Sequence, residues 1–284
     1  IIFAFYDLFA SERESGRLNL LSVSAQNTRS LWVPRILFRV LGIALAGLVP
    51  LWLGMLSERT ALGSAIGVSL AVLLQILFWT VLVLLIASRS AFRSETAASI
   101  SVGMWVVLTL AIPIAGKVYI ESSVAGIKGA EVSLVQREVV NDAWDLPISD
   151  TMNAFYASHP EWADSPPITG VWHWKWYYAF QQIGDETAAE LAREYRESIV
   201  ARDRLTAAVA WLSPAVAIQR RLEDLAQTNL EASFAFEDEV RGYHEKIRRA
   251  YYPVLFREIP FSQERLAQIV IPDFQISQKS GEGD

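Results

Sequence analysis

Residues 62–87 read LGSAIGVSLAVLLQILFWTVLVLLIA, with no charged side chain and with Gln75 as the most polar one. A bilayer core is about 30 Å thick, and a helix of about 20 apolar residues crosses it. A surface helix of a soluble protein would keep one polar face in water, and this segment has none. The alternative is burial on all sides in a large soluble core, which rarely extends over so many residues. We therefore interpret residues 63–87 as a membrane span.

Two neighbouring segments have the same character. The windows 40–57 and 96–116 also contain no charged residue. Together with the residues beside them, they predict spans at about 36–56 and 98–118. The sequence thus predicts a membrane part at residues 36–118 with three transmembrane helices.

The charge balance changes after the third predicted span. Residues 1–118 carry nine Lys or Arg and five Asp or Glu, a net +4, whereas residues 119–284 carry 16 and 26, a net −10. The chain has 284 residues, a net charge of −6 and no cysteine. The acidic balance argues against a nucleic-acid partner, and the lack of cysteine excludes disulfide scaffolds and cysteine nucleophiles. We expect an acidic, water-soluble domain after the membrane part.

Arginines indicate which side of the membrane is cytoplasmic. They are concentrated in residues 11–35, before the first span, and in residues 88–97, between the second and third spans. Loops rich in Lys and Arg stay in the cytoplasm, so both segments are expected there. The third span then leads outward, and residues 119–284 are expected to be extracytoplasmic. The sequence predicts a multi-pass protein of the plasma (inner) membrane.

The extracytoplasmic part, residues 119–275, is predicted to be a mostly helical domain. Apolar residues recur at helical spacing, and Ser213-Pro214 is typical of a helix start. Thr228 and Glu231 form a capping-box pattern, and Pro253 is expected to end or kink the last long helix. We expect helices at about 119–143, 174–212, 214–226 and from the capping box to about 252.

Both ends of the chain are interpreted separately. Residues 1–5 are apolar and are expected to be the inner end of an earlier span. They lack the basic start and cleavage site of a signal peptide. Residues 276–284 are polar and are expected to be a disordered tail.

Common catalytic and metal-binding patterns are missing from the sequence. It has no phosphate-binding loop, so we do not expect the chain to hydrolyse ATP itself. Its three histidines show none of the usual metal-ligand spacings, which favours surface or packing roles. Four tryptophans between residues 162 and 176 could form a ligand platform, although the domain core or the membrane interface is favoured for them.

One predicted cytoplasmic segment is more specific. Glu12, Arg13 and Glu14 are followed by Gly16, which suits a tight turn, and then by a leucine group starting at Leu18. The leucines can lie on the membrane or in the groove of a partner. An ordinary cytoplasmic loop with an interfacial helix explains the same residues, and the residue types alone leave both interpretations open.

The segment resembles a known family. The pattern Glu-Arg-Glu-x-Gly-x-Leu at residues 12–18 looks like the coupling-helix region of ABC-type export permeases of the ABC-2 family. Members usually have Gly-Thr-Leu where this chain has Gly16-Arg17-Leu18. Leu212-Ser213-Pro214-Ala215 and the residues after it are similar to a subgroup with a large extracytoplasmic helical insertion. That subgroup is often labelled as permeases linked to multi-copper enzyme maturation, although no copper ligands are visible here.

The resemblance implies a transmembrane permease subunit of an ATP-driven exporter. Such permeases pair with a second copy or a paralogue, and separate ATP-binding cassette subunits dock on the cytoplasmic side with ATP and Mg²⁺. The chain itself would carry no catalytic, cofactor or metal site. By matching positions, residues 1–35 would hold the coupling helix, and the contact with the ATPase subunit would be made by Glu12, Arg13, Glu14, Gly16 and Leu18.

Two other functions would also use an apolar membrane part of this kind. A membrane-anchored sensor or scaffold would bind a ligand or partner through its extracytoplasmic helical domain, but a sensor needs a signalling domain that this chain lacks. An intramembrane enzyme would place ionisable residues in its spans, and the three charge-free windows contain neither these nor histidine. The permease interpretation is therefore favoured.

Overall fold

The computed structural model describes residues 1–17, 23, 28–124, 126, 128–260, 262–268 and 274. Within these ranges the chain consists of helices and contains no strand, which confirms the predicted all-α fold class. In chain order the helices are α1 (Ile2–Phe5), α2 (Ala10–Glu14), α4 (Thr28–Ser57), α5 (Leu62–Ala87), α6 (Ser94–Val106), η1 (Val107–Ala111), α7 (Ile112–Ser123), α8 (Gly129–Asp142), α9 (Ile148–Ser158), η2 (Pro160–Trp162), α10 (Trp174–Ala210), α11 (Pro214–Ala226), α12 (Leu230–Phe256) and α13 (Gln263–Gln268).

Three helices are long and apolar enough to cross a membrane. They comprise Leu31–Ser57 in α4, Leu62–Ala87 in α5 and Ser94–Ser123, which is the continuous run of α6, η1 and α7. Each contains one of the spans predicted from the sequence. The predicted spans are therefore confirmed as helices of sufficient length and hydropathy.

The chain divides into two compact units. The first contains Ile1–Ser123 and Asp203–Asn229, and the second contains Val124–Arg202 and Leu230–Asp284. Helix α10 contributes to both, because its residues up to Arg202 belong to the second unit and the later ones to the first.

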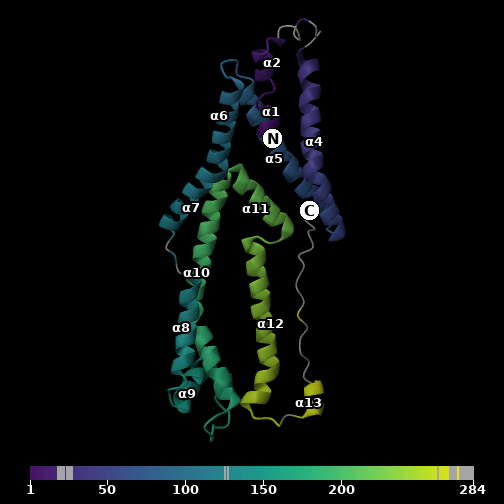
Figure 1. Ribbon diagram of the computed structural model, residues 1–284. Coiled ribbons are helices and arrows are strands. Elements are labelled where there is room, and N and C mark those ends of the chain that lie inside the picture. Colours follow the sequence, from purple (N-terminus) through teal and green to yellow (C-terminus); the bar gives the residue numbers. More distant parts are fainter. Residues whose placement is uncertain are drawn as a thin grey trace. The chain divides into compact units, whose positions relative to one another are not determined.

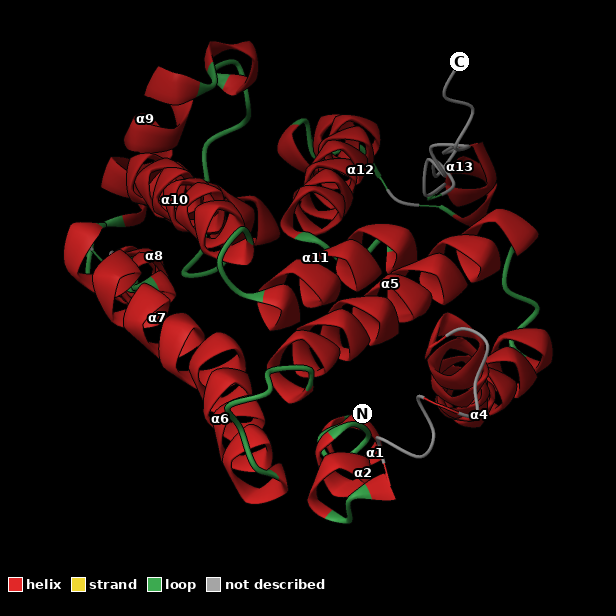
Figure 2. Ribbon diagram, turned by 90° about the horizontal axis from the view of Figure 1, so that it is seen from above, coloured by secondary structure: helices red, strands yellow, loops and turns green. Residues whose placement is uncertain are grey.

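Helix α5 is the centre of the first unit. Helices α1, α4, α6 and α11 pack against it, and α11 runs alongside it in both views (Figures 1 and 2). Phe5 and Leu8 bury their side chains in a cluster with Val83 of α5. The ring of Phe9 lies 4.7 Å from that of Trp32 in α4. These apolar contacts fix the segment that leads into α2.

The second unit has an aromatic core around its part of α10. Phe155 of α9 and Phe256 of α12 stack with ring centroids 5.0 Å apart, and Trp176 of α10 is buried in the same cluster. Trp162 packs against this core as well, whereas Trp172 and Trp174 are exposed. The favoured core role is therefore confirmed for two of the four tryptophans.

Lys175, near the start of α10, is fully buried in the second unit. Its Nζ donates to Oε1 of Glu258 at 2.5 Å and to the backbone oxygen of Pro166. The hydrogen bond from Lys175 is the largest cause of a lowered pKa at Glu258, and burial acts in the opposite direction. The buried ammonium is thus paired and hydrogen-bonded, as a charge in a protein interior must be.

The predicted helix at 119–143 is interrupted in the structure. Helix α7 ends at Ser123, and α8 starts only at Gly129. Gly126 and Gly129 lie at this break, and glycine is among the poorest helix formers because it loses the most backbone entropy.

The last long helix also differs from its prediction. Helix α12 starts at Leu230 and continues past Pro253 to Phe256, so Pro253 does not end it. Proline removes one backbone hydrogen bond of a helix. Here it lies in the last turn, so few backbone hydrogen bonds of the helix follow it.

Residues 203–229 group with the membrane helices and not with the rest of the predicted extracytoplasmic domain. Helix α11 within this segment has the bounds predicted for it, and its packing against α5 explains the grouping. The break between the units after Ser123 lies close to the boundary predicted at residue 118, and residues 203–229 are the part of the predicted second domain that groups with the first unit. The predicted tail at 276–284 lies outside the described residues.

Candidate functional site: the charged junction around α2

The charged junction comprises the charged residues of α2 and the groups they contact. Glu12, Arg13 and Glu14 follow one another in a short helix, so their side chains leave it in directions about 100° apart. As a result, each contacts a different segment of the first unit.

Glu12 joins α2 to the start of α4. Its Oε1 accepts a hydrogen bond from Nη1 of Arg35 at 3.1 Å, and its Oε2 lies 3.2 Å from Nε of Arg17. The Glu12 side chain is only 18% exposed. The Arg35 guanidinium also lies 5.5 Å from the centre of the Trp32 ring. The pair is therefore partly shielded from water, which strengthens it relative to a surface ion pair.

Arg13 joins α2 to the loop between α5 and α6. Its Nη2 donates to the backbone oxygen of Phe92 at 2.5 Å and approaches that of Arg89 at 3.4 Å. A guanidinium has five N–H donors in a planar fork, so one side chain can hold two carbonyls of a loop.

Glu14 caps helix α6. Its Oε1 accepts a hydrogen bond from the backbone N–H of Ser94 at 2.8 Å, and the Ser94 hydroxyl approaches Oε2 at 3.4 Å. The residue before α6, Arg93, makes no side-chain cap of its own. The first N–H groups of a helix lack partners within it and favour a negative charge. Glu14 therefore supplies from α2 the cap that α6 lacks.

Gly16 forms the turn that the sequence predicted. Its φ is +71°, in the left-handed region where residues with a Cβ are strained, and nothing lies within 4 Å of where a Cβ would stand. The requirement for glycine is thus conformational and not steric. Leu18, the last residue predicted for the site, lies outside the described residues.

The structure brings Glu12, Arg13 and Glu14 together with partners that the sequence did not indicate. Arg35, the 89–92 carbonyls and the Ser94 amide are all far from α2 in the sequence, up to 80 residues away. An arginine just before a span is a weak signal for an acidic partner, and backbone partners give no sequence signal. The junction has no catalytic arrangement. Its hydrogen bonds connect α2 to the start of α4, to the α5–α6 loop and to the start of α6.

The histidines and acidic side chains are the residues of this chain that could ligate a metal ion. Among residues the structure describes, no three or more His, Cys, Asp or Glu side chains gather closely enough to hold a metal ion. His159 stacks on Phe155 with ring centroids 4.5 Å apart, which is the packing role expected for it. The predicted absence of a cofactor in this chain stays a prediction.

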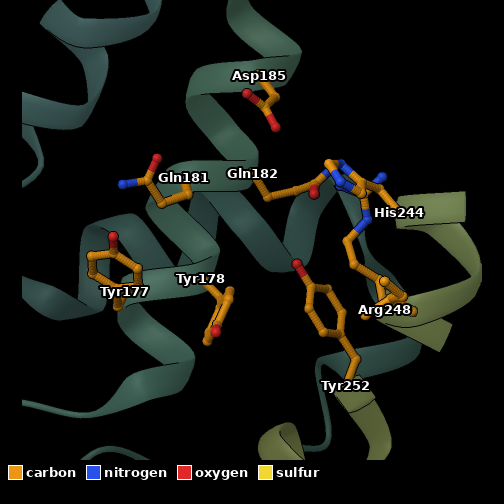
Figure 3. Close-up of a pocket in the computed structure, with 9 residues that line it drawn as sticks. Tyr177, Tyr178, Gln181, Gln182, Asp185, His244, Arg248 and Tyr252 are labelled. Atoms are coloured by element: carbon orange, nitrogen blue, oxygen red, sulfur yellow. The ribbon is translucent and has the colours of Figure 1, made fainter. Parts of the chain in front are cut away.

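A groove of about 340 Å³ lies between α10 and α12 in the second unit. Figure 3 shows Tyr178 and Asp185 on α10 across from His244, Arg248 and Tyr252 on α12. His244 and Arg248 are four residues apart, so they face the same side of their helix. Burial raises the pKa of Tyr252 to about 12, and the Arg248 charge opposes this. The groove offers phenol, imidazole and guanidinium groups to a small ligand.

Comparison with known proteins identifies the family. A family model described as a domain of unknown function, DUF3526, matches residues 130–277, just over half of the chain. The chain belongs to this DUF3526 family. No curated protein and no solved structure matches it. In this DUF3526 protein the matched range includes the groove and α11, whereas the charged junction around α2 precedes it.

Proposed function

We propose that this DUF3526 protein is the transmembrane permease subunit of an ATP-driven ABC exporter of the ABC-2 family. It would couple ATP hydrolysis by a separate subunit to substrate movement across the membrane. The observation that carries the proposal is the charged junction, because it fastens a short helix at the predicted cytoplasmic face to α4, to the α5–α6 loop and to α6. The three span-length helices support it.

The contacts suggest that different residues of the predicted coupling segment have different roles. Glu12, Arg13 and Glu14 hold the junction, whereas residues 15–17 form the exposed turn that follows. In the proposal the ATP-binding subunit docks on this exposed turn. Closure of that subunit around ATP and Mg²⁺ displaces α2, and Arg35 and Ser94 pass the displacement to the spans. The substrate would move between this permease and a second copy or paralogue.

Orientation in the plasma (inner) membrane can be tested on the cysteine-free chain. An impermeant thiol reagent applied to intact cells is expected to label Glu194→Cys, in the second unit, and to spare Ser15→Cys. Opening the cells should expose both positions. Labelling of Ser15→Cys alone in intact cells would reverse the orientation and remove the proposed docking side.

The exporter proposal is tested by purifying the tagged protein in mild detergent and identifying what accompanies it. We expect a P-loop ATPase to co-purify and Ser15→Trp to abolish its capture. Ser15 is exposed, so the bulky side chain should obstruct a partner. It removes the bonds of the Ser15 hydroxyl to the Glu12 backbone oxygen and to Arg17, but it leaves the Glu12–Arg35, Arg13 and Glu14 contacts in place. The matched control is Glu194→Trp, an equally bulky change at an exposed position of the second unit.

Two results would contradict the proposal. One is a membrane complex that is intact but contains no ATPase. The other is an ATPase that binds Ser15→Trp as well as the unaltered protein. Unchanged thermal unfolding of Ser15→Trp is the check that a loss of binding does not come from misfolding.

The groove between α10 and α12 favours a second candidate, a membrane-anchored sensor or scaffold. Its polar groups could hold a ligand or partner on the extracytoplasmic side. This candidate predicts a partner that is lost in Arg248→Ala and no ATPase. An ATPase that survives Arg248→Ala supports the exporter instead.

A further inference from the structure

A charge-free segment lies where α10 meets α11. Residues 205–218 read LTAAVAWLSPAVAI and stand between Arg204 and, after Gln219, Arg220. This length is too short to cross a bilayer as one helix, and it fits either a buried core helix or a segment that enters a membrane and returns. In the structure the segment folds into two arms, the end of α10 and the first half of α11, which meet at Ser213.

Both arms lie directly on membrane helices of the first unit. A Cβ at Gly116 of α7 would lie 2.8 Å from Cγ2 of Val209 in the α10 arm. A Cβ at Gly67 of α5 would lie 2.8 Å from Cδ2 of Leu225, further along α11. Small residues at such points let helices in a membrane approach closely. The two helices of the hairpin thus pack closely against two different spans, each at a glycine.

A hydrogen bond fastens the tip of the hairpin to the third span. Oγ of the fully buried Ser213 donates to the backbone oxygen of Leu108 at 2.7 Å. That oxygen needs a donor because the helix is π-helical here, and the N–H of Ile112 bonds to Val107 instead. The next donor in the π register would be residue 113, but Pro113 has no N–H. Ser213 supplies the missing donor.

The depth of this bond follows from its place in the span. Leu108 lies 14 residues after Ser94 and 15 before Ser123, at the middle of the third span-length helix. At about 1.5 Å per residue, the middle of such a helix coincides with the middle of a bilayer core about 30 Å thick. Leu108 therefore places Ser213 near the centre of the hydrocarbon region. An unpaired carbonyl there would have no water to bond with, so the Ser213 hydroxyl matters most at this depth.

Charges meet where the charge-free segment ends. Asp203 on the α10 arm and Arg220 on the α11 arm form a forked ion pair with N–O distances of 2.5 and 3.2 Å. The two arms thus neutralise each other's charge at the base of the hairpin, the level at which a headgroup region would begin.

We propose that residues 205–218 form a re-entrant hairpin that enters the bilayer and contacts lipid acyl chains through its tip. Trp211 and Leu212 at the tip are 92% and 64% exposed on the protein, although both are apolar. Acyl chains are the occupant that fits, because the tip is held at mid-span and carries no charge. This inference rests on the proposed placement of the three helices in a membrane.

Depth-dependent quenching tests the hairpin. Single cysteines replace Leu212, Ala217 and Thr228 in the cysteine-free chain, carry a fluorescent label, and are reconstituted into vesicles with lipids spin-labelled at different acyl positions. Quenching by the deepest spin label is expected to be strongest at position 212, weaker at 217 and least at 228. Leu110→Cys, on an exposed face of the third span, is the reference.

The reference separates two ways of failing. Deep quenching at Leu110→Cys without quenching at Leu212→Cys would overturn the hairpin and leave the membrane placement intact. No quenching at Leu110→Cys would overturn the membrane placement on which both proposals rest. Quenching of the labels at positions 212 and 217 by aqueous iodide, and by no lipid, would place the segment in water.

The Ser213–Leu108 hydrogen bond gives a second test. Ser213→Ala is expected to reduce deep quenching at position 212 at least twofold, because the tip loses its attachment. Adding Pro113→Ala supplies a backbone N–H to the helix at Leu108 but no bond to the tip, so the quenching at position 212 should stay low. Ser101→Ala is the matched control, since the Ser101 hydroxyl is also buried but has no hydrogen-bond partner. Equal quenching in Ser213→Ala and the unaltered chain would overturn the role of this bond.

Discussion

The two units each contain a cluster of charges, and the clusters do different things. In the first unit, Arg13 bonds to backbone oxygens of the α5–α6 loop and Glu14 to the first backbone N–H of α6. In the second, the fully buried Lys175 is paired with the side chain of Glu258 and with one backbone oxygen. The first arrangement ties separate segments together, and the second neutralises a charge inside one core. Charge content alone therefore does not reveal the role of a cluster. The groups it contacts do.

The largest effect is expected when the Lys175–Glu258 pair loses its carboxylate. Glu258→Gln leaves the Lys175 ammonium buried without a counter-charge. We expect this to reduce the free energy of unfolding by about 2–4 kcal/mol. This loss is smaller than for a fully buried pair, because water reaches Glu258. Lys175→Met should cost less, since the freed carboxylate can turn to water. Thermal unfolding followed by tryptophan fluorescence reports on this unit, and equal stability of both variants would contradict the burial argument.

Low pH should weaken the same pair. Lys175 lowers the pKa of Glu258 in the folded protein. A carboxyl group with a lowered pKa stabilises the folded state above its unfolded pKa, and this contribution is lost as the pH falls through the folded value. Unfolding temperature measured from neutral to acidic pH should therefore fall less steeply in Glu258→Gln than in the unaltered chain. If the unfolding temperatures of both proteins fell equally with pH, Glu258 would not be the source of the pH dependence.

Reversing Glu12 should disturb the charged junction and leave the second unit unchanged. Glu12→Lys faces Arg17 and Arg35 with a like charge and removes charged hydrogen bonds worth about 1.5–3 kcal/mol. Hydrogen exchange should increase in α2 and at the start of α4, which Glu12 joins, but not in α12. Glu194→Lys, an exposed reversal, serves as the control. Increased exchange throughout the chain would show that the effect of the junction is not confined to the first unit.

The smallest effect is expected at Gly16. Gly16→Ala places a Cβ in a left-handed backbone conformation at a cost of about 1–2 kcal/mol, although no atom obstructs it. Gly16→Asn should recover part of this loss, because asparagine tolerates that conformation. Gly116→Ala gives the contrast, since there the Cβ would meet Val209. Recovery by asparagine at position 116 and not at 16 would reverse the explanation.

Most of the fold was predictable because helices and spans depend on neighbouring residues. The three spans, α10 and α11 follow from apolar length, helical spacing and the Ser213-Pro214 start. The break before Gly129 was missed because two glycines were outweighed by the apolar pattern around them. At the candidate site, the sequence singled out Glu12, Arg13, Glu14 and Gly16 and indicated none of their partners.

The sequence by itself determined where the helices are and which of them can cross a membrane, because these properties are summed over adjacent side chains. Only the tertiary structure decided that Glu14 caps α6 from 80 residues away and that Ser213 completes the helix at Leu108 from 105 residues away. Such bonds join a side chain to a backbone group, and backbone groups are the same in every residue except proline, which lacks the N–H. Only the packing of the helices determines which side chain lies beside which backbone group.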